Sequence, residues 1–174
     1  MRRAAFVLFA LYWLGSSAAF ADGPSRAQTS AAEFVQRFYD WYTPLAHQDT
    51  KSPPWILALN KRGAEFDSGL SRALREDWAA QRRVHDDIVG LDFDPILMSQ
   101  DPLDKYTVGN VSEEGGAYLV SVYGVQDGHR ADKPSVVAEL KPSKGAFIFT
   151  NFRYGADGDL LGTLKILREQ RAHH

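Results

Sequence analysis

One predicted helix places a carboxylate in a row of leucines, where a carboxylate could act as a base. In "GLSRALREDWAAQRR", Asp77 continues an apolar row at helical spacing, and Trp78 lies beside it. Burial raises the pKa of a carboxylate toward neutral pH, and tyrosine hydroxyls can donate to it. We expect Asp77 to be buried near Tyr39 or Tyr42. The candidate wall of a ligand pocket therefore consists of Tyr39, Tyr42, Asp77 and Trp78. The alternative is that Asp77 faces water at the end of its helix.

A second group of carboxylates lies in the segment "HDDIVGLDFDPILMSQDPLDKY". A calcium loop needs acids at alternate positions, a glycine at its bend and a closing glutamate. Asp92 and Asp94 begin such a pattern, but Pro95 breaks it. Turn and helix-capping roles account for most of these acids. Asp92, Asp94, Asp101 and Asp104 are nevertheless a candidate acidic loop for a protein partner.

Composition gives no indication of a metal or a cofactor. The chain has no cysteine, and its five histidines are scattered or terminal, so neither a disulfide nor a cysteine or histidine zinc site is expected. No serine–histidine–aspartate order and no glycine-rich phosphate loop is present. A net charge of −2 argues against binding nucleic acid or an anionic membrane surface.

The first residues have the pattern of a cleaved signal peptide. Arg2 and Arg3 precede a short apolar run, and Ala19-Phe20-Ala21 is a small-x-small cleavage site. About 20 apolar residues are needed to span a membrane, and this run is shorter. We expect residues 1–21 to be removed near Ala21-Asp22, which gives a periplasmic protein without stable membrane insertion.

The mature chain begins with an aromatic helix. Ser30 and Glu33 form the sequence pattern of a capping box, and Pro44 should end the helix. Two apolar stripes follow at 100° per residue, and the first of them is expected to be the core. The first stripe consists of Phe34, Phe38, Trp41 and Leu45, and the second consists of Val35, Tyr39 and Tyr42.

Further helices and then strands follow. Helices are expected after Ser52, from Asp67 or Ser68, and from Asp159. Between the last two, four alternating segments with short turns predict an antiparallel meander. The segments are "YTVGNV", "GAYLVSVYGV", "SVVAEL" and "AFIFTNFRY". In the last, we expect Phe152 and Tyr154 to face the core and Arg153 to face water.

Helices first and strands after predict an α+β fold. The N-terminal helices should pack on one face of a curved four-stranded antiparallel meander, with a short C-terminal helix. Residues 22–29 are expected to form a flexible tail, and 30–170 a single domain.

The order of three motifs resembles that of a known family. "FVQRFYDWY", "FDPILMSQDP" and "AFIFTNFRY" together resemble the domain-of-unknown-function family 3828, which consists of exported bacterial proteins. The family pattern tends to have Phe where this chain has Ile96. The resemblance implies a cystatin-like or nuclear-transport-factor-2-like architecture and assigns no activity.

Three functions are compatible with these features. The first is a non-catalytic domain that binds a small ligand or an envelope protein. The second is an inhibitor or immunity protein that presents the acidic loop to an envelope enzyme. The third is a cone-fold enzyme that uses Asp77 as its single buried carboxylate.

Overall fold

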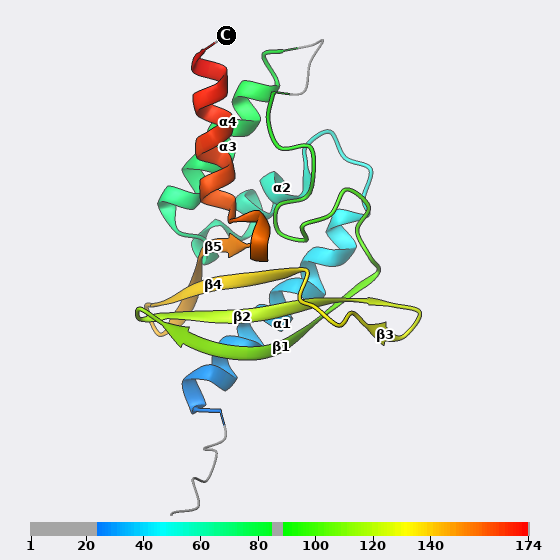
Figure 1. Cartoon of the computed structure of the whole chain (residues 1–174), viewed down its shortest axis with the longest axis vertical. Coiled ribbons are helices and arrows are strands. Elements are labelled where there is room, and N and C mark those ends of the chain that lie inside the picture. Colours follow the sequence, from blue (N-terminus) through cyan, green and yellow to red (C-terminus); the bar gives the residue numbers. More distant parts are fainter. Residues whose placement is uncertain (1–23, 85–88, 174) are drawn as a thin grey trace, which may run out of the picture.

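The computed structural model describes residues 24–84 and 89–173, so the expected signal peptide lies outside the described residues. The described residues form an α+β fold with a curved antiparallel sheet (Figure 1). The helices and strands, in chain order, are α1 (Arg26–Ala46), α2 (Pro54–Arg62), the 3-10 helix η1 (Gly63–Glu65), α3 (Ser68–Gln81), β1 (Lys105–Glu114), β2 (Ala117–Gln126), β3 (His129–Arg130), β4 (Val136–Ser143), β5 (Ala146–Arg153), the 3-10 helix η2 (Gly155–Asp157) and α4 (Leu160–Ala172).

Helix α1 is longer at both ends than the sequence predicted. Its capping box is formed by Ser25 and Gln28, so Ser30 lies inside the helix and residues 26–29 are not a tail. Pro44 also lies inside the helix, because α1 continues past it to Ala46. A proline removes a hydrogen bond and clashes with the preceding turn, but this one lies in the last turn, where only two helical residues follow it.

The starts of α3 and α4 agree with the predicted caps, whereas α2 has Pro53 at its N-cap and no side-chain cap from Ser52. Asp67 caps α3 by accepting from the Gly69 and Leu70 amides, and Asp159 caps α4 by accepting from the Gly162 amide. Helix α2 starts at Pro54, where a proline is tolerated because the first amides of a helix have no partner inside it.

The predicted meander is confirmed, with the order β1-β2-β4-β5 and the short β3 beside β2. Three two-residue turns connect neighbouring strands, and in each turn both residues have positive φ. These turns are Gly115-Gly116, Asp127-Gly128 and Lys144-Gly145. Such turns match the right-handed twist of the strands, which explains the glycine in every one of them.

Neither outer strand presents a complete free edge. The backbone amide of Asp67 donates to the Phe149 carbonyl of β5 over 2.8 Å. On the other side, the Gln36 carboxamide of α1 bonds the Val108 amide and the Tyr106 carbonyl of β1, at 2.8 and 3.2 Å. A side chain thus replaces the neighbouring strand there, and covering an edge in this way disfavours strand-to-strand association.

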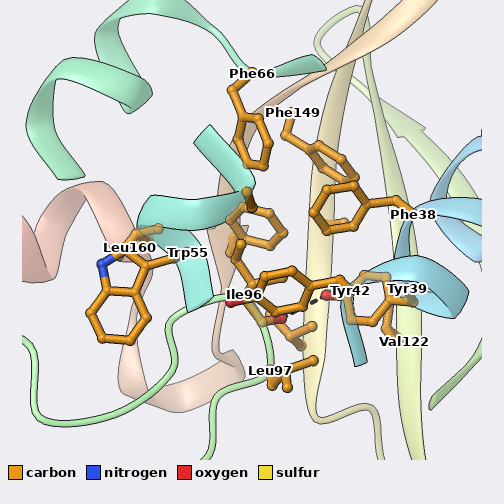
Figure 2. Close-up of a cluster of buried hydrophobic side chains, with 14 of the residues drawn as sticks. Phe38, Tyr39, Tyr42, Trp55, Phe66, Ile96, Leu97, Val122, Phe149 and Leu160 are labelled. Carbon is orange, nitrogen blue, oxygen red and sulfur yellow. Dashed lines mark hydrogen bonds between the residues drawn. The ribbon is translucent and has the colours of Figure 1, made fainter. Parts of the chain in front are cut away.

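The core lies between α1, α2, the segment after α3 and the inner face of the sheet (Figures 1 and 2). Its centre on α1 is Val35, Phe38, Tyr39 and Tyr42, whereas Phe34 and Trp41 are only half-buried. The buried side of α1 is therefore rotated away from the predicted first stripe, because the sheet contacts the helix where the two stripes meet. Phe152 and Tyr154 face the core as predicted, and Arg153 points to the opposite face of the sheet.

Helices α3 and α4 both begin at β5 and extend away from the sheet side by side (Figure 1). Helix α3 follows the bond from Asp67 to Phe149, and α4 follows a bridge between Arg153 and Asp159. The two helices are therefore roughly parallel. In the described part of the chain, no helix combines the length and the apolar character that crossing a membrane requires.

Candidate functional site

The candidate pocket residues do not come together as one wall. Tyr39 and Tyr42 are fully buried in the core, where each hydroxyl has a partner. Asp77 is buried as expected, with 3% of its surface exposed, but its donors are an arginine and a backbone amide. The prediction of a tyrosine donor for Asp77 was therefore wrong. Trp78 of α3 is half-buried and packs against the core.

The tyrosines instead hold the segment that follows the Asp94-Pro95 step. The Tyr42 hydroxyl donates to Asp94 Oδ2 over 2.7 Å, and Asp94 Oδ1 accepts from the Ile96 and Leu97 amides at 2.9 and 3.1 Å. The Tyr39 hydroxyl donates to the Ile96 carbonyl over 2.6 Å (Figure 2). Every polar group named here has a partner, so this cluster resembles a satisfied core network more than an open pocket.

Asp94 has the property that the sequence predicted for Asp77, namely a carboxylate pKa raised by burial. Burial raises the pKa of Asp94 to about 6, although the donors from Tyr42, Ile96 and Leu97 oppose this shift. Burial and the nearby Asp94 charge also raise the pKa of Tyr42, so this hydroxyl stays protonated and donates. Asp94 borders a surface cavity of about 270 Å³, but both of its oxygens are already bound to donors. A base needs a free lone pair facing substrate, so this geometry favours a role in fixing the loop.

The raised pKa of Asp94 predicts that stability decreases as pH rises. The folded chain binds a proton at Asp94 more tightly than the unfolded chain. The resulting stabilisation of the fold is therefore complete below about pH 4 and is lost as pH rises past about 6. Two pKa units correspond to about 3 kcal/mol. Asp94→Asn removes the titration, because an amide does not ionise in this pH range. The amide oxygen can still accept from the Ile96 and Leu97 backbone amides, so the loop keeps these contacts. The unfolding free energy of this variant, relative to the parent, should therefore increase by up to about 3 kcal/mol between pH 4 and 7 in urea titrations.

The matched control is Asp92→Asn, since Asp92 is an exposed carboxylate two residues away. Its difference from the parent should stay constant over the same pH range. If both variants showed the same pH profile, the Asp94 carboxylate would not be the titrating group.

The predicted acidic loop is only partly available to a partner. Asp92, Asp101 and Asp104 are exposed, and Asp104 lies 3.7 Å from the His47 imidazole. Asp94 is buried, so its inclusion in a partner-binding surface was wrong. Asp86 and Asp87 lie outside the described residues.

Asp77 connects α3 to α4 and to the loop between α3 and β1. The Arg171 Nη1 atom of α4 donates to Asp77 Oδ1 over 2.6 Å and to the Val89 carbonyl over 2.7 Å. The Leu91 amide donates to Asp77 Oδ2 over 3.0 Å. A Cβ on Gly90 would lie 2.7 Å from Asp77 Oδ2, so only glycine allows this close approach. Asp77 therefore has a structural role at the far end of both helices.

A groove of about 530 Å³ lies between α3 and α4, and Asp77 with Arg171 lies at its end. Its floor is apolar and consists of leucines and small residues: Gly69, Leu70, Ala73, Ala80, Leu161, Leu164 and Ala172. The small side chains of α3 leave the space that a larger residue would fill. Leu161 is 37% exposed, although large apolar side chains are usually covered.

Charged side chains form the rim of this groove. The cations are Arg72, Lys165, Arg168 and Arg171, and the carboxylates are Asp67, Glu76 and Asp77. Asp77 is paired with Arg171, and Asp67 caps α3 through Oδ1 but has no cation as its partner among the described residues. Apart from the Asp77–Arg171 pair, the rim has three cations and two carboxylates, so it has a net positive charge in a chain of negative net charge.

Another charged cluster lies on the face of the sheet opposite to the core. Arg153 donates to Glu139 Oε2 through Nε and Nη2, at 2.9 and 2.7 Å, and through Nη1 to Glu114 at 3.0 Å. Asn151 donates to the α4 cap Asp159 over 2.8 Å. These pairs connect β1, β4, β5 and α4, and each nitrogen of the Arg153 guanidinium has a carboxylate partner.

The basic residues of α4 were not among the site residues predicted from the sequence. A signal was present, because Lys165, Arg168 and Arg171 recur at helical spacing beside the leucine row. Only the fold shows that this row faces α3. Among the described residues, no group of three or more acidic or histidine side chains could hold a metal ion.

Comparisons with models of protein families, with curated proteins and with solved structures found no match to this chain. The class of protein is therefore given by the fold alone, as an α+β domain with a helical groove. The resemblance to the domain-of-unknown-function family 3828 and to the cystatin-like architecture receives no support from these comparisons and stays a prediction of the sequence.

Proposed function

We propose that this chain is an exported, non-catalytic ligand-binding protein and that the groove between α3 and α4 is its binding site. The observation that carries the proposal is the groove itself, with an apolar floor and a charged rim. Its volume of about 530 Å³ falls within the range of about 300–1,000 Å³ that is usual for small-molecule sites. Such sites are common between packed helices.

The state of the two buried carboxylates supports binding over catalysis. Asp77 accepts from Arg171 and Leu91, and Asp94 accepts from Tyr42 and two backbone amides. Each carboxylate holds neighbouring segments together, and neither presents an unoccupied oxygen to the groove. The enzyme alternative, which relied on Asp77 with tyrosine donors, loses that arrangement.

Blocking the groove should abolish the binding of an apolar ligand. Ala73 lines the floor of the groove on α3, so Ala73→Phe should fill it. The probe is N-phenyl-1-naphthylamine, which is uncharged and fluoresces in apolar surroundings. We expect saturable binding to the parent, and binding at least about tenfold weaker to Ala73→Phe, because a phenyl ring excludes the ligand from the floor.

The matched control is Ala79→Phe, which places the same side chain on the other side of α3. This variant should bind the probe like the parent, and circular dichroism should show the same helix content in all three proteins. Equal probe binding by the two variants, or no saturable binding by the parent, would rule out the groove as the site.

Export is the second part of the proposal, and the pattern of residues 1–21 supports it. Protein recovered from the cell envelope should have the mass of a chain that starts near Asp22. A full-length species in that fraction would contradict cleavage.

One observation favours the inhibitor alternative, namely the exposure of Asp92, Asp101 and Asp104. If the protein captured a basic envelope enzyme, changing these three residues to asparagine should abolish the capture and leave probe binding unchanged. The two functions are thus separable by variants on different surfaces.

A further inference from the structure

The rim of the groove identifies the class of ligand. We propose that the groove binds a single-chain aliphatic carboxylate, with its hydrocarbon chain on the leucine floor and its carboxylate between Arg72 and Lys165. This inference rests on the proposed function, because it assumes that the groove is a binding site.

The parallel course of the two helices brings these two cations to the same height. Arg72 is four residues from the start of α3 at Ser68, and Lys165 is five residues from the start of α4 at Leu160. At about 1.5 Å per residue, they lie about 6 and about 7.5 Å along their axes. Both helices start at β5, so Arg72 and Lys165 lie on opposite rims of the groove at nearly the same distance from the sheet.

The carboxylates of the rim do not neutralise this pair. Arg72 forms no ion pair within the described part of the chain, and Lys165 has only an exposed contact of 3.9 Å with Glu169. Exposed pairs at that distance contribute little. Glu76 lies one turn further from the sheet than Arg72, on the same helix. An anion at the level of Arg72 and Lys165 would therefore meet two available cations.

The floor beneath these cations is suited to a hydrocarbon chain. Leu70, Ala73, Leu161 and Leu164 line it without a hydrogen-bonding side chain. Burying the exposed surface of Leu161 under a ligand is favourable at about 25 cal/mol per Å². A polar ligand would lose hydrogen bonds to water there, so the floor selects an apolar body and the rim selects a negative head.

Three ligands with the same ten-carbon chain separate these two contributions. Decanoate, 1-decanol and decyltrimethylammonium are used to displace N-phenyl-1-naphthylamine from the full mature chain at pH 7.5 and low salt. We expect decanoate to displace the probe at a concentration at least about tenfold lower than decyltrimethylammonium, with decanol between them, because charge-assisted contacts form only with the anion. The advantage of decanoate should decrease in 0.5 M salt.

A double variant locates the head of the ligand. Arg72→Gln combined with Lys165→Gln should remove the advantage of decanoate and leave decanol unchanged. The control, Arg37→Gln with Lys61→Gln, changes net charge equally at exposed positions on α1 and α2, and should bind like the parent. A phosphate-headed lipid is tested separately with vesicles of phosphatidylglycerol, to which we expect no binding.

The outcomes distinguish the inference from the proposed function. If the three ten-carbon ligands displaced the probe equally, or if only vesicles were bound, the carboxylate inference would be overturned, whereas probe binding that Ala73→Phe abolishes would still support the groove. If neither the probe nor any of the ten-carbon ligands bound, the carboxylate inference and the proposed function would both fail.

Discussion

Phe38→Ala is expected to lower the free energy of unfolding by about 3–5 kcal/mol, the usual cost of removing a large buried ring. Phe38 has no exposed surface, and its ring centroid lies 4.7 Å from that of Phe149, 5.4 Å from Tyr42 and 5.6 Å from Phe66. The ring thus connects α1 to β5 and to the segment that leads into α3 (Figure 2). Urea titration followed by tryptophan fluorescence measures the loss.

Trp41→Ala is the informative comparison for Phe38→Ala. The sequence predicted Trp41 at the centre of the core stripe, but Trp41 is half-buried and the Arg62 guanidinium covers its ring at 4.1 Å. A half-exposed ring loses less on truncation, so Trp41→Ala should cost clearly less than Phe38→Ala. An equal or larger loss for Trp41→Ala would place the centre of the core where the sequence predicted it.

Local signals in the sequence predicted most of the elements. Asp67 and Asp159 precede apolar helical patterns, and each accepts from at least one amide within the next three residues. These contacts depend only on residues close in sequence, so the sequence reveals them. The Asp-Gly and glycine-containing turns are equally local, since a positive φ at a two-residue turn favours glycine.

The position of α1 on the sheet could not be predicted in the same way. Its two stripes both carry aromatic rings, and apolar periodicity alone does not say which stripe faces the sheet. Contact with β1 and β2, and with Phe149 of β5, selects the side that contains Val35, Phe38, Tyr39 and Tyr42. The phenol hydroxyls then require partners, and the Asp94 segment supplies them.

The candidate site depended on contacts that are distant in sequence. Asp77 and its partner Arg171 are separated by 94 residues, and they meet only because α3 and α4 run parallel from β5. The apolar row correctly predicted that Asp77 is buried. Its partner could not be identified from the row, because a buried carboxylate accepts equally from a tyrosine, an arginine or a backbone amide.

Arg171→Met is expected to lower the free energy of unfolding by about 3 kcal/mol. The change leaves the Asp77 carboxylate buried with one donor, the Leu91 amide, and leaves the Val89 carbonyl without Arg171. Removing one partner of a buried ion pair costs about 3–5 kcal/mol, and we expect the lower end because 20% of the Arg171 side chain is exposed. Lys165→Met on the same helix breaks only an exposed contact and should cost less than about 1 kcal/mol.

The double variant Asp77→Asn with Arg171→Met tests the cause of the Arg171→Met loss. If the loss comes from an unpaired buried charge, removing that charge should recover a large part of it, because the methionine stem retains apolar contact and an amide can still accept from Leu91. If the loss comes only from missing contacts of the arginine side chain, the double variant should be no more stable than Arg171→Met. A loss for Arg171→Met as small as that for Lys165→Met would mean that the pair does not hold α4 against α3, and the closed end of the groove would then need another explanation.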